Sequence, residues 1–172
     1  MKKWVYPAMA AALYVALTLA IAPLSYHAVQ FRFSELLVFL AFVDARYIPG
    51  LTLGCFLANL FGPFGLADAI GGSLATLFSV GMIALTAYAW RRKTGGKRGL
   101  TAALGVASIW PAVSALIIAF EMVAFCGDDG NYWYWTAMVA AGEIGVVTLC
   151  GVPLMRGLYR YHPQLMEQLK IK

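Results

Sequence analysis

Six long apolar segments, separated by short breaks rich in polar residues, glycine or proline, dominate this sequence. They cover roughly residues 7–24, 33–45, 48–62, 67–90, 100–125 and 133–158. Hydrophobic residues make up 62% of the 172 residues and charged residues only 12%, against about 25% charged in a typical soluble domain. Such a chain cannot cover its own surface with polar groups. We therefore expect an all-α integral membrane protein that forms a single transmembrane domain over residues 1–172.

Segment length predicts six transmembrane helices. A helix needs about 20 residues to cross the hydrocarbon core, and the first, fourth, fifth and sixth segments are long enough. The second and third are short, and we expect a tilted or partly buried pair joined by the turn at residues 44–47. The first segment could instead be a cleaved signal peptide, but Pro23 directly follows its small-residue pattern at 20–22 and should block processing.

The basic residues predict the orientation. If the N-terminus is cytoplasmic, six crossings place the C-terminus in the cytoplasm as well. Every lysine and arginine except Arg32 then lies on the inner side. The net charge of +5 is therefore interpreted as an insertion signal and not as a nucleic-acid site.

Two helices carry small residues at every fourth position, a spacing that lets another helix approach closely. The alanine stripe consists of Ala8, Ala12, Ala16 and Ala20, and the glycine stripe of Gly50, Gly54, Ala58 and Gly62. We expect the glycine stripe to pack inside the bundle. The alanine stripe fits internal packing or the docking of another subunit equally well.

Several polar residues fall inside the predicted membrane region, where they are costly and become functional candidates. Residues eleven apart return to nearly the same helix face, so Trp110 shares a face with Glu121, and Tyr132 with Glu143. Carboxylates accept N–H groups and aromatic rings stack, so this lining predicts a small polar ligand with a flat ring.

Each of these residues also has a structural interpretation. Asp68 could cap its helix, Arg32 and Glu35 could form an i, i+3 ion pair, and Asn59 could bond to another helix. The two deeper glutamates have no cation within the membrane to pair with, so their structural role would be as protonated carboxyls bonded to a neighbouring helix.

Motifs for chemistry are missing from the sequence. It contains no GxxxxGK[ST], GxSxG or HExxH pattern and no CxxC pair. We therefore expect no catalysis, no metal and no cofactor. A small six-helix protein with an outward-facing pocket and no ATPase motif is expected to be the ligand-binding part of a larger complex.

Three blocks of sequence point to a family: QFRFSELLVF (30–39), IPGLTLGCFLANLFG (48–62) and LADAIGGSLATL (66–77), followed by GEIGVV (142–147) and GVPL (151–154). In their order and spacing they resemble the QueT family. That family comprises substrate-binding S components of energy-coupling-factor (ECF) transporters for queuosine precursors.

The resemblance implies an S-component fold with cytoplasmic termini in a prokaryotic cytoplasmic membrane. It also implies partners: a membrane coupling subunit, which would dock on the alanine stripe, and two cytoplasmic ATPase subunits. The implied ligand is a 7-deazaguanine, carrying either a 7-cyano or a 7-aminomethyl group, under a gate formed by the loop between the first two helices.

The expected ligand site combines the polar residues above with the 30–39 block. Glu143 is preferred for the ring edge, and Asn59 or Gln30 for the ring oxygen. The full set is Gln30, Arg32, Glu35, Asn59, Asp68, Trp110, Glu121, Tyr132 and Glu143. Two other functions stay open: an S component for a different vitamin-like ring compound, and an intramembrane enzyme or structural assembly subunit.

Overall fold

The computed structural model describes residues 2–26, 29–96, 98–125 and 131–171. Every element of regular structure among these residues is helical, which confirms the predicted all-α class. In chain order the elements are α1 (Lys2–Ala20), α2 (Ala22–Ser25), the 3-10 helix η1 (Phe33–Phe39), α3 (Leu40–Val43), the 3-10 turn η2 (Ala45–Tyr47), α4 (Ile48–Leu60), α5 (Gly65–Thr94), α6 (Leu100–Ala107), α7 (Ile109–Phe125), α8 (Tyr132–Glu143), the π-helix η3 (Ile144–Gly151), α9 (Val152–Tyr161) and α10 (Pro163–Gln168).

The six predicted segments coincide with single helices or with helices that continue one another. Within the described part of the chain, three such helices are long and apolar enough to cross a membrane: 65–94, 100–125 and 132–161. The apolar helices at 4–20 and 33–43 are shorter. The spanning role expected of the first segment, and with it the count of six spans, therefore stays a prediction.

Helix α5 shows why the boundaries lie where they do. It begins at Gly65, whose φ of 61° only glycine adopts readily, and ends at Gly95, a left-handed C-cap with φ 64°. Three basic residues occupy its last turn, where their positive charge stabilises the helix by interacting with the negative end of its dipole.

The two small-residue stripes have opposite roles. A Cβ atom on Gly50 would lie 2.2 Å from the Pro7 carbonyl oxygen, and one on Gly54 would lie 2.9 Å from Cβ of Tyr14. Helices α1 and α4 therefore pack backbone against backbone, and the internal role predicted for the glycine stripe is confirmed. All four residues of the alanine stripe are exposed, so this stripe faces away from the bundle.

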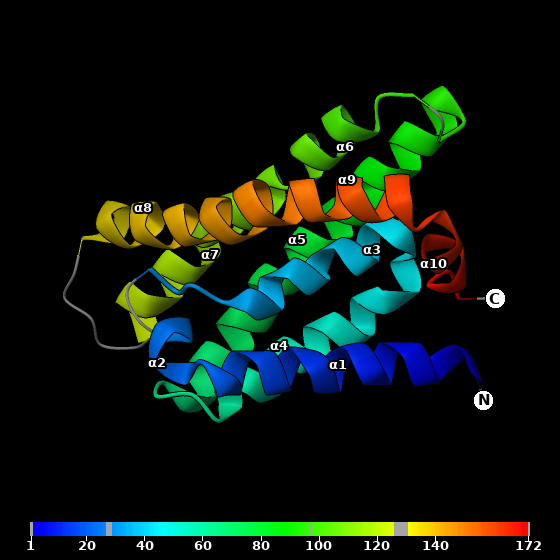
Figure 1. Ribbon diagram of the computed structural model, residues 1–172. Coiled ribbons are helices and arrows are strands. Elements are labelled where there is room, and N and C mark those ends of the chain that lie inside the picture. Colours follow the sequence, from blue (N-terminus) through cyan, green and yellow to red (C-terminus); the bar gives the residue numbers. More distant parts are fainter. Residues whose placement is uncertain (1, 27–28, 97, 126–130, 172) are drawn as a thin grey trace.

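The bundle places α8 and α9 along one side and α1 with α4 along the other (Figure 1). Between them runs the short η1–α3 helix, whose Phe39 and Phe42 are completely buried. Both chain ends lie at one end of the bundle, and α2 and the start of α8 lie at the other (Figure 1).

The C-terminal tail folds back onto the bundle. Tyr47 donates its hydroxyl to the Leu169 carbonyl over 2.9 Å, and the Ile171 amide donates to Asp44 Oδ2 over 3.0 Å. Met166 and Ile171 are buried in the main core. The tail thus closes the end of the bundle that carries both termini.

Candidate functional site

The segment from Val29 to Glu35, which overlaps the first family block, has an unusual backbone conformation. Gln30 has a φ of 46°, the only positive value among described non-glycine residues. A Cβ atom on Gly142 of α8 would lie 1.9 Å from the Val29 carbonyl oxygen, so only glycine fits there. The helix that follows is 3-10 over seven residues, longer than such helices usually run. Strained backbone of this kind collects at functional sites.

Arg32 is the buried centre of the polar residues, with 4% of its surface exposed. Its Nε donates to the Ser25 carbonyl over 2.9 Å and its Nη1 to Asn59 Oδ1 over 3.0 Å. Its Nη2 is buried and has no hydrogen-bond partner. Arg32 and Glu35 do not form a salt bridge, so the alternative of an interfacial ion pair is wrong.

Asn59 joins α4 to α5. Its Nδ2 donates to the Asp68 carbonyl over 3.1 Å, so the interhelical hydrogen bond considered for it is present. Asp68 is not the cap of its helix, because α5 begins three residues earlier and Phe64 occupies the N-cap position, without a side-chain capping bond. It lies instead in the first turn, 3% exposed, and its Oδ2 has no hydrogen-bond partner.

Glu35 is held by α1. The Tyr14 hydroxyl donates to its Oε1, and one turn further along α1, Thr18 donates to Ser34 Oγ over 2.7 Å. Sequence reasoning missed both α1 residues. The available signal was their i, i+4 spacing as the polar side chains of an otherwise apolar helix.

Glu143 lies where α8 ends and the π-helix η3 begins. It is 7% exposed, and its Oε2 is buried without a hydrogen-bond partner. It interacts electrostatically with Glu35 and Arg32 across the bundle. Because π-helical turns occur frequently at functional sites, the local geometry agrees with the role predicted for this residue.

Together these residues form what we call the Arg32 cluster: Arg32, Glu35, Asn59, Asp68 and Glu143. Arg32 also interacts electrostatically with Asp68 and Glu35. Arg32 is a cation in the surroundings of Glu143, but the two form no salt bridge among the described residues. Three carboxyl groups still face a single guanidinium, and one donor and two acceptor atoms are unpartnered. Such a cluster can bind a small ligand that carries both N–H donors and an acceptor.

Residues 4–160 match the model of the QueT transporter family. The chain belongs to the QueT transporter family. It is 35% identical over 117 residues to the Queuosine precursor transporter QueT of Lactococcus lactis subsp. cremoris (strain MG1363), covering 67% of this chain and 69% of the relative. No solved structure matches this QueT-family chain. The resemblance seen in the sequence blocks is confirmed, and the family together with the long apolar helices makes this a membrane transport protein.

Other predicted site residues of the QueT-family chain lie around the Arg32 cluster. Gln30 is buried, and its Nε2 lies 3.9 Å from Sδ of Met122 on α7. Glu121 is also buried, and its Oε2 would lie 2.3 Å from a Cβ atom on Gly71. The Asn59 amide instead lies over Gly72, the next residue of α5, so Glu121 approaches a different face of that helix.

Trp110 and Tyr132 are bonded elsewhere in this QueT-family structure. The Trp110 indole donates to Thr86 Oγ1 over 3.0 Å, and eleven residues of helix separate it from Glu121 by about 16 Å. The Tyr132 hydroxyl donates to the Leu116 carbonyl over 3.1 Å and so ties α8 to α7. Among the described residues, neither side chain is hydrogen-bonded to a member of the Arg32 cluster.

Trp135 on α8 was not among the expected site residues, yet its Nε1 is buried and has no hydrogen-bond partner. The ring packs against a small core that includes Met122 and Val139. Its i, i+4, i+8 relation with Val139 and Glu143 was the signal that could have placed it inside the bundle.

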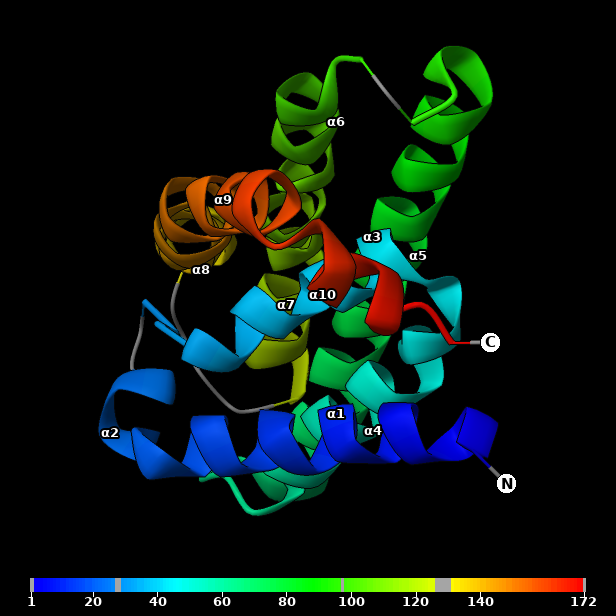
Figure 2. The same cartoon turned by 45° about the vertical axis from the view of Figure 1, so that its right-hand side comes forward.

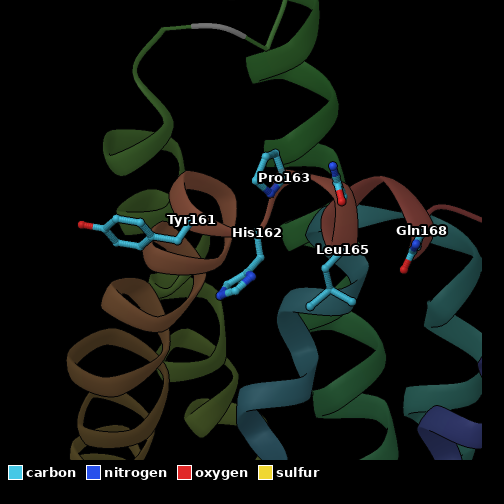
Figure 3. A pocket seen from close by; sticks show the side chains of 6 residues that line it. Tyr161, His162, Pro163, Leu165 and Gln168 are labelled. Carbon is cyan, nitrogen blue, oxygen red and sulfur yellow. The ribbon is translucent and has the colours of Figure 1, made fainter.

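A surface hollow of about 490 Å³ at the junction of α9 and α10 is a poor alternative site for this QueT-family transporter (Figure 3). The labelled side chains of Tyr161, His162 and Gln168 point in different directions around it (Figure 3). No carboxylate lines it. We therefore regard the Arg32 cluster as the candidate site.

Proposed function

We propose that this protein is the substrate-capture (S) subunit of an ECF-type importer, and that it binds a 7-deazaguanine queuosine precursor from outside the cell. The observation that carries the proposal is the Arg32 cluster, a buried set of unpartnered donor and acceptor atoms. Membership of the QueT family and the name of the Lactococcus relative support this choice of ligand.

The chemistry of the ring fits the cluster. A guanine-type edge presents N–H donors at N1 and N2, which pair with one carboxylate, and we assign that role to Glu143. The ring oxygen O6 needs a donor, and Arg32 Nη2 is the buried donor without a partner. Trp135 offers a stacking surface, and base stacking on an aromatic ring contributes about 1–3 kcal/mol.

The group at position 7 would meet the remaining acids. An aminomethyl group is cationic and would pair with Asp68 Oδ2, which has no partner within the protein. A cyano group is only a weak acceptor and would leave that carboxyl unsatisfied. Both bases stay candidates, and the comparison of their affinities measures how much this second acid contributes.

The path of the ligand across the membrane follows from the arrangement of the helices in the membrane that we propose. Six crossings with both termini in the cytoplasm of a prokaryotic cell would place the segment from Val29 to Glu35 near the outer side. This segment would close over the ligand, and no step of catalysis would occur. The chain has no nucleotide-binding motif, so energy would come from two ATPase subunits through a membrane coupling subunit.

The first test measures equilibrium binding of the ligand to the purified protein in detergent by calorimetry. We expect tight binding of a 7-cyano or 7-aminomethyl deazaguanine, and at least about 100-fold weaker binding of guanine, thiamine and riboflavin. Tight binding of a vitamin instead would contradict the queuosine assignment and leave an S component for another ring compound. Turnover of any ligand by the isolated chain would contradict the capture role.

The alanine stripe is the proposed docking surface for the coupling subunit. Ala12→Trp is expected to reduce co-purification with the coupling subunit at least tenfold, because a large ring prevents close helix approach. Leu13→Trp is the matched control, since Leu13 is exposed on a neighbouring face of α1. Ligand binding by the isolated subunit should be unchanged in both variants. Equal losses of co-purification would show that the stripe has no special part in docking.

A further inference from the structure

A groove of about 520 Å³ runs between the end of α5 and α6, on the side that faces away from the bundle. Figure 2 shows these two helices standing apart at the top of the molecule. The groove is lined by Thr86, Ala89, Trp90, Lys93, Thr94, Arg98, Gly99, Ala102, Ala103 and Val106. It does not touch the Arg32 cluster, and the proposed function makes no use of it.

Away from its charged residues, the groove is lined largely by apolar side chains, which are small except for the ring of Trp90. Ala89 comes from α5, while Ala102, Ala103 and Val106 come from α6. Both helices belong to the long apolar segments that can cross a membrane. The groove lies at the end of α5 and the start of α6, which is where such helices leave the hydrocarbon core. A trough of this kind suits an acyl chain.

The mouth of the groove carries positive charge. α5 has 30 residues and is therefore about 45 Å long, more than the roughly 30 Å hydrocarbon core, so its basic last turn reaches the lipid headgroups. Lys93 and Arg98 line the mouth and are exposed. Neither takes part in a salt bridge within the described residues.

The turn that carries Arg98 is held in place by Trp90, a residue that lines the groove. The Trp90 indole donates to the Arg98 carbonyl over 2.7 Å, which holds the turn after α5 against the helix. The neighbouring Arg91 is used differently, because its guanidinium turns inward and donates to the Val43 carbonyl over 2.9 Å. Of the residues that the structure describes, two cations, Lys93 and Arg98, therefore remain at the mouth of the groove.

We propose that this groove binds an anionic phospholipid, with an acyl chain between α5 and α6 and the phosphate between Lys93 and Arg98. Basic pockets between transmembrane helices bind anionic headgroups in this way. A zwitterionic lipid has the same acyl chains but adds a cation next to the phosphate, so it fits the mouth less well.

The test is native mass spectrometry of the full chain in detergent, titrated with phosphatidylglycerol or phosphatidylcholine of identical acyl chains. We expect phosphatidylglycerol to be retained preferentially. One cation contributes about fivefold to such binding, so Lys93→Gln should weaken it about fivefold and Lys93→Gln/Arg98→Gln about 25-fold. The matched control is Arg92→Gln, because Arg92 is the exposed neighbour on the same helix and does not line the groove.

A second variant tests the apolar trough without a change of charge. Ala102 is exposed in the groove wall, so Ala102→Trp should fold normally and fill the space that an acyl chain needs. It is expected to weaken phosphatidylglycerol binding at least fivefold. The proposal is overturned if Arg92→Gln loses as much binding as Lys93→Gln, if the two lipids bind equally, or if Ala102→Trp has no effect.

Discussion

Glu143→Gln is expected to weaken binding of the deazaguanine ligand about 100-fold, which is the largest effect we predict on binding. Removing one partner of a buried charged hydrogen bond costs roughly 2–5 kcal/mol. The amide also turns one acceptor into an N–H donor that faces the donors of the ring edge. Calorimetry of the purified variant against the unchanged protein measures the difference.

The same variant should not lose stability. Oε2 of Glu143 has no partner within the protein, so the substitution breaks no bond there and the melting temperature in detergent should stay the same or rise. Glu167→Gln, which changes an exposed acid on α10, is the control and should leave binding unchanged. Unchanged ligand binding in Glu143→Gln, together with failed assembly of the importer, would instead indicate a structural role for this residue.

Arg32→Met should have the opposite profile and act mainly on folding. Methionine keeps the apolar part of the side chain but leaves the Ser25 carbonyl and Asn59 Oδ1 without their donors. It also leaves the buried carboxyls of the Arg32 cluster without a cation. We expect a loss of about 3 kcal/mol in the free energy of unfolding, seen as a melting temperature lower by about 6–12 °C.

A matched arginine on the surface provides the control for this prediction. Arg46 pairs with Asp44 at 3.1 Å, but its side chain is 49% exposed. Arg46→Met should therefore change stability by less than about 1 kcal/mol. If Arg32→Met and Arg46→Met have the same melting temperature, Arg32 does not stabilise the cluster. Its main role would then be the one predicted for it in ligand binding.

The positions of the helices could be predicted from sequence because each depends on local chemistry. Apolar runs end where glycine, proline or charge interrupts them, and so 100–125 and 48–62 are close to the observed helices. The start of α5 differed by two residues because the positive φ of Gly65 lets the helix begin directly after the turn. Asp68 lies within the first turn of the observed helix, and Phe64 occupies the N-cap position.

The candidate site was only partly predictable. Burial of Glu35, Asn59, Asp68 and Glu143 followed from the cost of polar groups in lipid. Arg32 was also expected in the site, but its hydrogen bond to Asn59 could not be predicted, because the two residues lie 27 positions apart in the sequence. Trp110 was predicted to line the site only because it shares a helix face with Glu121. A shared face does not show how far apart two residues lie along the helix.

The sequence by itself determined that this chain is helical, that it belongs in a membrane, and to which family it is similar. These properties follow from composition, from the length of apolar runs and from short blocks of residues. The tertiary structure alone decided which of two stripes with the same spacing packs inside, since Gly50 and Gly54 face α1 while the alanines face outward. It also decided the 3-10 and π-helical turns beside the Arg32 cluster. The physical reason is that each depends on what the neighbouring helix presents, and a single segment of sequence does not contain its neighbours.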